Sequence, residues 1–252
     1  MPTVWAARFP GCPFVLEQPG GPICRKECKM MKGYLNSCRA ENGLFEVLVQ
    51  GCTLRCAYCD RPACWEKEKA PLVLTAEELL EQLQQSGAGT LLVSGGEPLE
   101  QAEFLTAVFA ACRKKGITTV LDTPGSRVNP EVEALLDVTD KVQLHLKDST
   151  EEGYRRYTGG SLLWATMFLE LLEKKQIPTD LRQLLVPGLN DTPDNARFMK
   201  GLPRKYSCVK SCVFLPFAKG ETPALYAALG LEYPMKAYRD ATAQDVSDMK
   251  YY

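Results

Sequence analysis

The amino-acid sequence predicts an α/β fold built on a parallel sheet. From residue 44 onward, six short runs rich in Val, Leu and Ile recur, and segments with apolar residues at helical spacing separate them. This alternation favours parallel strands joined by right-handed crossovers. A chain of 252 residues, 45% of them hydrophobic, is long enough for one large domain with a substantial core. Six such units could form an open partial barrel or a doubly wound sheet.

The predicted elements follow one another regularly along the chain. The strand-like runs occupy residues 44–50, 90–94, 118–122, 142–146, 180–186 and 211–216. A helix is predicted over 75–85, with Thr75 as its cap and Glu78 in the position of a capping box. Residues 100–116 carry acids early, bases late and a final glycine, which predicts a second helix. Further helices are predicted near 131–137, 151–157, 161–175, 193–200 and 242–250.

Residues 1–43 differ from the rest of the chain. Pro, Gly, Lys and four cysteines crowd this stretch, and its apolar residues show little periodicity. We therefore predict an irregular, Cys-rich N-terminal extension over 1–43, followed by the α/β domain over 44–252.

Composition and charge exclude some classes of partner. The formal net charge is -1 and no long block of one sign occurs, so nucleic acid is not an expected partner. The start of the chain lacks a basic region followed by an apolar stretch, and the most apolar segment, residues 161–172, is short and interrupted by Glu170. We therefore expect a cytoplasmic protein without a membrane segment. In a reducing compartment, eleven cysteines favour metal ligation or redox chemistry over disulfides.

Three cysteines follow the first predicted strand in the segment "GCTLRCAYCD". The loops at the carboxyl ends of parallel strands face the site where chemistry happens in β/α folds. The spacing of Cys52, Cys56 and Cys59 lets one loop direct three thiolates to three corners of an iron-sulfur cube, a cluster usually held by four cysteines. One iron would stay open to a substrate, as in catalytic metal sites. Alternatives are a zinc knuckle that uses Cys64, or reduced cysteines packed in a loop; the single histidine, His145, disfavours mixed Cys/His zinc sites.

Beyond this loop the sequence resembles the radical S-adenosylmethionine (SAM) enzymes and, among them, the pyruvate formate-lyase activating enzymes. After "GCTLRCAYCD", the segments "SGGEP", "LDTPG", "LHLKD", "LVPGLND", "FLPFAKG" and "LGLEYPM" follow in the order expected of that family. The resemblance covers about residues 44–240. It implies a partial (β/α)6 barrel of TIM type.

The resemblance also implies roles for individual residues. Cys52, Cys56 and Cys59 would hold a [4Fe-4S] cluster whose unique iron binds SAM. Lys147 would be a further catalytic residue. Among the cofactor contacts, the family's pattern places the methionyl amino group at Gly95, Gly96 and Glu97. The adenine would lie near Tyr58, the adenosine near Gly188, and the methionine part or a monovalent cation near Asp122 and Lys147. A purely structural role is the alternative at these positions. Gly95 and Gly96 could form a turn before a helix, and Gly188 could belong to a Pro-Gly turn. Tyr58 could be a packing aromatic residue, and Lys147 a solvated lysine at a strand end.

The chain departs from the family's pattern at three positions. His145 stands where a second aspartate is usual, and an imidazole is a poor ligand for an alkali cation, which puts the cation site in doubt. Pro124 replaces an asparagine, and Ala218 stands where a histidine is typical. Cys12, Cys24, Cys28 and Cys38 could hold a second, fully ligated cluster, or could be scattered reduced thiols. Cys208 and Cys212 are expected in the core.

The function implied by the resemblance is the activation of a glycyl radical enzyme. The chain would cleave SAM reductively and take a hydrogen atom from a glycine of the partner, with pyruvate formate-lyase as the expected partner and reduced flavodoxin or ferredoxin as the electron donor. One alternative is a radical SAM enzyme acting on a small molecule, similar to 7-carboxy-7-deazaguanine synthase, which would need a closed polar pocket. A distant alternative is a non-catalytic module in which metal only stabilises the fold.

Overall fold

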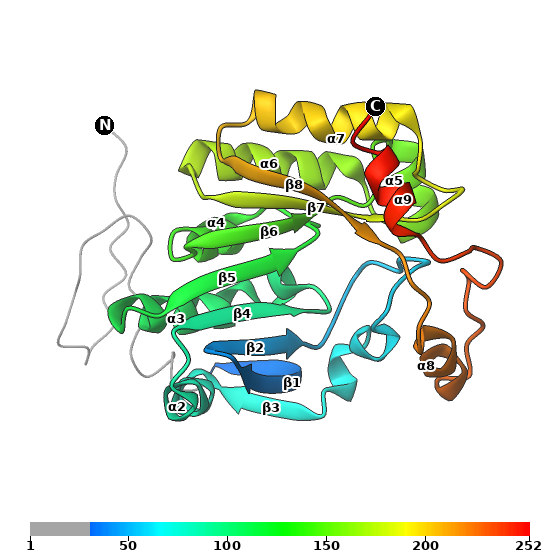
Figure 1. The fold of residues 1–252 in the computed structure, drawn as a ribbon. Helices are drawn as coiled ribbons and strands as arrows, with labels where there is room; N and C mark the ends of the chain where they lie inside the picture. The colour runs from blue at the N-terminus through cyan, green and yellow to red at the C-terminus, as the bar shows by residue number, and fades with distance from the viewer. Residues whose placement is uncertain (1–30) are drawn as a thin grey trace, which may run out of the picture.

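A computed structural model describes residues 31–252, which fold around one eight-stranded sheet (Figure 1). The strand order is β3-β1-β2-β4-β5-β6-β7-β8. The six strands β2, β4, β5, β6, β7 and β8 are parallel to one another. The sheet ends at β3 on one side and at β8 on the other, so it does not close. The predicted α/β fold is confirmed, and an unclosed parallel sheet of six β/α units is consistent with the partial barrel.

All six predicted strands are present. Their bounds are β2 (Leu44–Val49), β4 (Thr90–Gly95), β5 (Thr118–Thr123), β6 (Lys141–His145), β7 (Thr179–Leu185) and β8 (Val209–Pro216). Residues that are nearly or fully buried alternate with more exposed ones along β2, β6 and β7, because successive side chains of a strand point to opposite faces of the sheet.

Two further strands were not predicted. β1 (Lys32–Glu41) and β3 (Leu72–Thr75) are antiparallel to their neighbours, and β1 pairs with both β2 and β3. The prediction of irregular structure up to residue 43 is therefore wrong for β1. The physical reason is a tight hairpin: Asn42 and Gly43 both have positive φ, 50° and 78°, and connect the paired residues Glu41 and Leu44. Cys12, Cys24 and Cys28 of the predicted extension lie outside the described residues.

The helices largely follow the predicted ranges. They are α2 (Ala76–Ser86), α3 (Ala102–Lys114), α4 (Pro130–Leu136), α5 (Glu151–Thr158), α6 (Leu162–Lys175), α7 (Pro193–Lys205), α8 (Thr222–Ala228) and α9 (Ala243–Asp248), with short 3-10 helices η1 (Pro62–Cys64), η2 (Lys67–Lys69) and η3 (Pro98–Gln101). The capping box of α2 forms as predicted, since Thr75 and Glu78 bond reciprocally. The helix predicted from residue 100 begins as η3, and α8 was missed because it is short and begins at a Thr-Pro sequence of turn-like composition.

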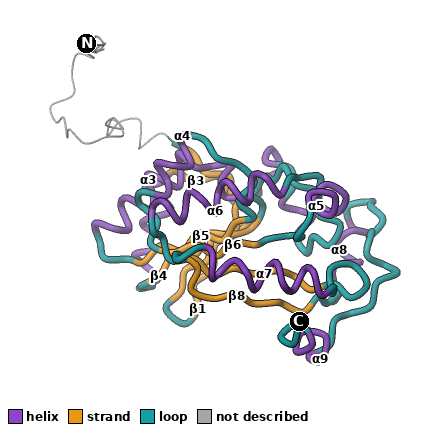
Figure 2. Tube along the Cα trace, turned by 90° about the horizontal axis from the view of Figure 1, so that it is seen from above, coloured by secondary structure: helices purple, strands orange, loops and turns teal. Residues whose placement is uncertain are grey.

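Helices cover the outer face of the sheet and build the main core. α2 contacts α3, α3 contacts α4, α4 contacts α6, and α7 packs on β8. Seen from above, α3 and α6 run along the strands, with α7 nearer the viewer (Figure 2). The main core joins inward residues of every parallel strand with the inner faces of these helices. Among residues 31–252, no helix combines the length and apolarity needed to cross a membrane.

The carboxyl ends of the parallel strands meet at one side of the molecule. In Figure 1 the arrowheads of these strands point toward the side where α5, α8 and α9 lie. A second, smaller apolar cluster forms here, separate from the main core. Its buried members are Tyr58, Val186, Phe217, Tyr226, Tyr233 and Met235. The cysteine loop borders this cluster through Cys56, so the fold gathers the predicted site at the strand ends.

Candidate active site

The cysteine loop runs from the end of β2 to η1 and is fixed by main-chain hydrogen bonds. The amide of Cys52 donates to the carbonyl of Trp65 at 3.1 Å, and the amide of Ala57 donates to Tyr157 at 2.7 Å at the end of α5. Within the loop, the amide of Cys59 donates to the carbonyl of Cys56 at 3.0 Å. All three thiols are free and half-buried. The loop is therefore shaped by contacts of its backbone, which leaves the thiols available as ligands.

Gln50, the residue before Gly51, fixes the cysteine loop through hydrogen bonds of its side chain. Its side chain is almost fully buried, at 1% exposure, and its Nε2 donates to the carbonyls of Ala63 at 2.6 Å and Glu66 at 2.9 Å. Gln101 of η3 in turn donates to the carbonyl of Gln50 at 2.9 Å. The sequence analysis did not identify Gln50 as a site residue. The signal that could have found it is a polar side chain at the end of an otherwise apolar strand.

The glycines of "SGGEP" allow a close backbone approach to the loop. Gly95 has a φ of 110°, and a Cβ there would lie 2.5 Å from the nitrogen of Val49. A Cβ on Gly96 would overlap the carbonyl oxygen of Gly51, the residue before Cys52. The amide of Gly96 donates to Val49 at 2.9 Å, and the next amide donates to Gly51 at 2.8 Å. Both glycines are thus required to join β4 to the base of the cysteine loop.

Glu97 is fully buried and its carboxylate is engaged by protein groups. Oε1 accepts from the amide of Leu99 at 3.0 Å and from the hydroxyl of Thr123 at 2.7 Å, and Oε2 accepts from the amide of Ser126 at 3.4 Å. Burial raises the pKa of Glu97 above its ordinary value, and these hydrogen bonds oppose the rise. The structure places Glu97 as a link between the ends of β4 and β5, while its contact with a cofactor stays a prediction.

Asp122 near the end of β5 lies beside His145 at the end of β6. Its Oδ1 is 2.8 Å from Nε2 of His145, in a geometry outside that of a regular hydrogen bond, and its Oδ2 accepts from the hydroxyl of Ser94 at 3.1 Å. Burial would raise the pKa of Asp122, but the contacts with His145 and Ser94 outweigh it and lower the pKa below the ordinary value. The carboxylate therefore stays ionised, with an imidazole beside it.

Tyr58 and Lys147 are brought together from distant parts of the chain. The hydroxyl of Tyr58 donates to the carbonyl of Lys147 at 3.2 Å, and the amide of Lys147 donates to the hydroxyl of Tyr154 at 3.0 Å. The side chain of Lys147 has no ion-pair partner among the described residues. Burial raises the pKa of Cys56, and the positive charge of Lys147 is the largest opposing influence. The lysine charge thus acts on the cysteine loop.

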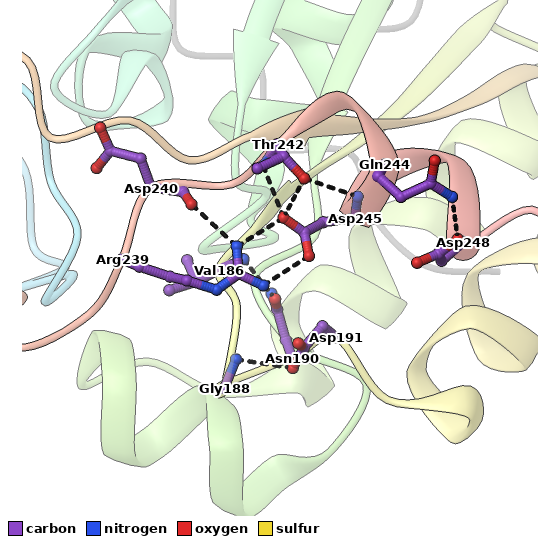
Figure 3. Close-up of polar contacts among 10 residues, drawn as sticks. All are labelled: Val186, Gly188, Asn190, Asp191, Arg239, Asp240, Thr242, Gln244, Asp245 and Asp248. Atoms are coloured by element: carbon purple, nitrogen blue, oxygen red, sulfur yellow. Dashed lines mark hydrogen bonds and ion pairs between the residues drawn. The ribbon is translucent and has the colours of Figure 1, made fainter.

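Gly188 lies in the loop between β7 and α7, which a polar network fixes (Figure 3). Its φ is 80°, and its amide donates to Asp191 at 2.9 Å. Asn190 closes the same loop by accepting from the amide of Val186 at 2.8 Å. In Figure 3 the pair of Arg239 with Asp245 lies over this loop, and its two hydrogen bonds measure 2.7 and 2.6 Å. Gly188 itself is exposed at this edge of the molecule.

The three thiols share one neighbourhood whose chemistry fits an iron-sulfur cluster. Burial raises the pKa of Cys52 to about 12, with further increases from Glu97 and from the other two thiols, and burial raises the pKa values of Cys56 and Cys59 as well. Ligation of a metal would therefore release protons that the thiols otherwise keep. Across residues 31–252, no group of three or more His, Cys, Asp or Glu side chains is arranged around the position of a single metal ion. In a cubane each thiolate binds a separate iron, so the three thiols need not surround one metal position.

The remaining predicted cysteines are packed in the structure. Cys208 is buried before β8 and Cys212 is half-buried against the main core, as expected for core residues. Cys64, the candidate fourth zinc ligand, is buried in η1. Cys38 lies in β1, half-buried against the same core, and burial raises its pKa to about 11. The structure thus places one member of the proposed second set; Cys12, Cys24 and Cys28 lie outside the described residues, and the second cluster stays a prediction.

Pro124 and Ala218, the two other positions that differ from the family's pattern, lie in loops at the strand ends. Pro124 follows β5 directly and precedes Gly125, which has a φ of 67°, and Ala218 follows Phe217 after β8. Neither side chain makes a polar contact. The structure thus contains no hydrogen bond from these positions to the residues of the site.

The fold and this loop define a class of protein. The sequence model of the radical SAM superfamily matches residues 47–198, more than half of the chain. The solved structure of a radical SAM methyltransferase from Sphaerobacter thermophilus has a TM-score of 0.57 and 12% identity, and the likeness covers 85% of this chain and 64% of that one. At that identity the likeness concerns the fold. The chain belongs to the radical SAM superfamily.

Within the superfamily, the similarity is to one family of enzymes. The chain is 31% identical over 215 residues to the pyruvate formate-lyase 1-activating enzyme of Escherichia coli K12, which covers 82% of this chain and 86% of the relative. It is 34% identical over 213 residues to the pyruvate formate-lyase-activating enzyme of Clostridium pasteurianum, with 81% and 86% covered. The chain is thus an enzyme of the pyruvate formate-lyase activating family, as the sequence motifs predicted.

Proposed function

We propose that the chain activates a glycyl radical enzyme, and that pyruvate formate-lyase is this partner. The observation that carries the proposal is the similarity to pyruvate formate-lyase activating enzymes over 82% of the chain. Wherever it begins, a match of this extent includes the cysteine loop and the carboxyl ends of the strands from β4 to β7. Reduced flavodoxin or ferredoxin is the proposed electron donor, and the cytoplasm is the proposed location.

In this proposal Cys52, Cys56 and Cys59 hold a [4Fe-4S] cluster, and SAM binds beside them. When bound there, the cluster would supply the electron for cleavage of the carbon-sulfur bond of SAM, which gives methionine and a 5'-deoxyadenosyl radical. The radical then takes a hydrogen atom from a glycine Cα of the partner. The products are 5'-deoxyadenosine and a glycyl radical, so one electron from the donor and one SAM are used for each activation.

The chain's own residues bind and orient SAM. Gly95 and Gly96 present main-chain groups to the methionyl amino group. Glu97 fixes the end of β4 through the hydrogen bonds that its carboxylate accepts. Lys147 offsets the negative charge of the thiolates and of the methionyl carboxylate. We assign the adenine to the neighbourhood of Tyr58, which the aromatic residues of the smaller apolar cluster surround.

The Gly188 loop is assigned to the adenosine. Its support is the closed network around Gly188, which presents a rigid main chain at the same edge as the cysteine loop. A fixed loop orders a ligand at a lower entropic cost than a mobile one.

Two further assignments remain proposals. A monovalent cation near Asp122 would have to share that carboxylate with His145, whose Nε2 lies 2.8 Å away. A second cluster held by Cys12, Cys24, Cys28 and Cys38 would use the half-buried thiol of Cys38 on β1. Iron analysis of a Cys38→Ala variant tests the second of these assignments, because four irons per chain would be lost if a second cluster exists.

The experiment that tests the proposed function is anaerobic incubation with SAM, reduced flavodoxin and pyruvate formate-lyase, followed by electron paramagnetic resonance. We expect a glycyl doublet with the wild type and none with Cys56→Ala. Formation of 5'-deoxyadenosine without a doublet would reject the partner and favour a small-molecule substrate. A colourless protein that binds zinc and does not cleave SAM would reject the enzyme function altogether.

A further inference from the structure

Tyr226 carries a buried hydroxyl that no group among the described residues satisfies. Among residues 31–252, five buried side-chain atoms lack a hydrogen-bond partner: Ser126 Oγ, Gln143 Oε1, His145 Nε2, Tyr206 OH and Tyr226 OH. Tyr226 is 1% exposed. Buried polar groups are almost always paired, so an unpaired phenol in a site points to a partner that arrives with the ligand.

The ring of Tyr226 is held in one orientation by aromatic neighbours. Trp65 meets it edge to face with ring centres 5.7 Å apart, and Tyr233 packs against it with ring centres 5.0 Å apart. Its main chain is fixed as well, because its carbonyl accepts from the amides of Leu229 and Leu231, each at 3.0 Å. The hydroxyl therefore cannot turn away to water without displacing this packing.

The phenol lies next to the cysteine loop. α8, which carries Tyr226, contacts η1 directly after the loop, and Cys56 packs against the same apolar cluster as Tyr226. Burial raises the pKa of Tyr226 well above its ordinary value, and among charged groups Cys59 adds most to this rise, followed by Tyr233 and Cys56. The unused donor is thus within electrostatic reach of two thiols that the proposed function assigns to the cluster.

We propose that Tyr226 is a positioning residue whose hydroxyl donates a hydrogen bond to the Cys59 thiolate when that thiolate holds iron. Such a bond stabilises the extra negative charge of the reduced state, so it raises the reduction potential of the site. The C-terminal segment thereby tunes the step in which SAM receives its electron. This inference rests on the proposed cluster.

The test compares Tyr226→Phe with the wild type after anaerobic reconstitution, in the absence of SAM. The variant keeps the ring and its packing and removes only the hydroxyl. We expect equal iron and sulfide content and equal circular dichroism, a reduction potential shifted to more negative values, and an altered paramagnetic resonance spectrum of the reduced site. Tyr206→Phe, the same change at a buried tyrosine of the main core, should leave the potential unchanged. Equal potentials for Tyr226→Phe and the wild type, or an equal shift in both variants, would overturn the proposal.

A second substitution keeps the proposal testable if Tyr226→Phe fails to assemble the cluster. Site-specific 3-fluorotyrosine at position 226 preserves the shape and makes the phenol a stronger donor, so the potential should shift to more positive values. An unchanged potential would reject the bond to Cys59. Weaker SAM binding by Tyr226→Phe with an unchanged potential would also reject it, because the hydroxyl would then serve SAM.

The outcomes separate this inference from the proposed function. A wild-type protein that binds no cluster overturns both. A wild-type protein that binds the cluster but forms no glycyl radical overturns only the choice of partner, and the potentials of the variants still decide the role of Tyr226.

Discussion

Gly96 of the strand-end motif and Gly51 of the cysteine loop meet backbone against backbone, so closely that a Cβ on Gly96 would overlap the Gly51 carbonyl oxygen. The same carbonyl accepts a hydrogen bond of 2.8 Å from the amide of Glu97. Two segments 45 residues apart in the sequence therefore share one rigid contact, and the position of Cys52 depends on it.

A methyl group at Gly96 should displace the cysteine loop. We expect Gly96→Ala to lower the free energy of unfolding by about 1–3 kcal/mol, the usual cost of overpacking, and to reduce the iron bound on reconstitution. Chemical denaturation and iron analysis measure the two effects. Gly201→Ala in α7 is the matched control, since a Cβ there meets no atom within 4 Å and alanine favours a helix. Wild-type iron binding by Gly96→Ala would show that the loop does not depend on this contact.

Replacing Cys64 should distinguish a cluster from a zinc knuckle. Cys64 is buried in η1, where it packs beside the loop, and the proposed cluster does not use it. We expect Cys64→Ala to keep the full iron and sulfide content and the charge-transfer absorption, at a stability cost of about 1 kcal/mol. Cys56→Ala, by contrast, should lose both. Loss of metal from Cys64→Ala, with zinc in the wild type, would favour the knuckle.

Removal of the Lys147 charge should weaken SAM binding without disturbing the fold. The hydrogen bonds of this residue to Tyr58 and Tyr154 use its main chain, so Lys147→Met preserves them. We expect the dissociation constant of SAM to rise about tenfold, which corresponds to about 1.4 kcal/mol. Equilibrium binding with reconstituted protein measures it. Lys141→Met, at the opposite end of β6, is the control and should bind SAM as the wild type does.

Glu173 should make stability depend on pH in the acid range. Hydrogen bonds from the amide of Cys208 and the hydroxyl of Ser207, each at 2.8 Å, lower the pKa of Glu173 from 4.5 to about 2. A lowered folded-state pKa gives stability that is complete above 4.5 and is lost as the pH falls toward about 2. The stability difference between the wild type and Glu173→Gln should therefore shrink below pH 4.5, as denaturation at several pH values can measure. A difference that grows on acidification would contradict this assignment.

Much of the fold followed from local pattern, and the exceptions have physical causes. The six parallel strands and α2 were predicted because periodicity and a capping box are properties of neighbouring residues. β1 was missed because its strand state comes from pairing with β2 and β3, although the Asn42-Gly43 turn was a readable signal. α8 is too short to show a helical period.

The predicted site residues gathered at one edge, but their contacts could not be read from the sequence. Glu97 was expected at a cofactor, and the structure engages its carboxylate with Leu99, Thr123 and Ser126. Tyr226 drew no attention, since an aromatic residue in a short helix looks like ordinary packing. Its unpaired hydroxyl is apparent only in the folded chain, where α8 contacts η1.

The sequence by itself determined the three thiols, the order of the strand-end motifs and therefore the family, because spacing within a loop and alternation of β and α units are local. The tertiary structure decided which groups lie around the cysteine loop: the Lys147 charge, the Gly96 backbone and the ring of Tyr226 come from three distant segments. Their proximity depends on how the strands line up and how the C-terminal segment folds back, and these follow from the burial of apolar surface by the whole chain rather than by any one segment.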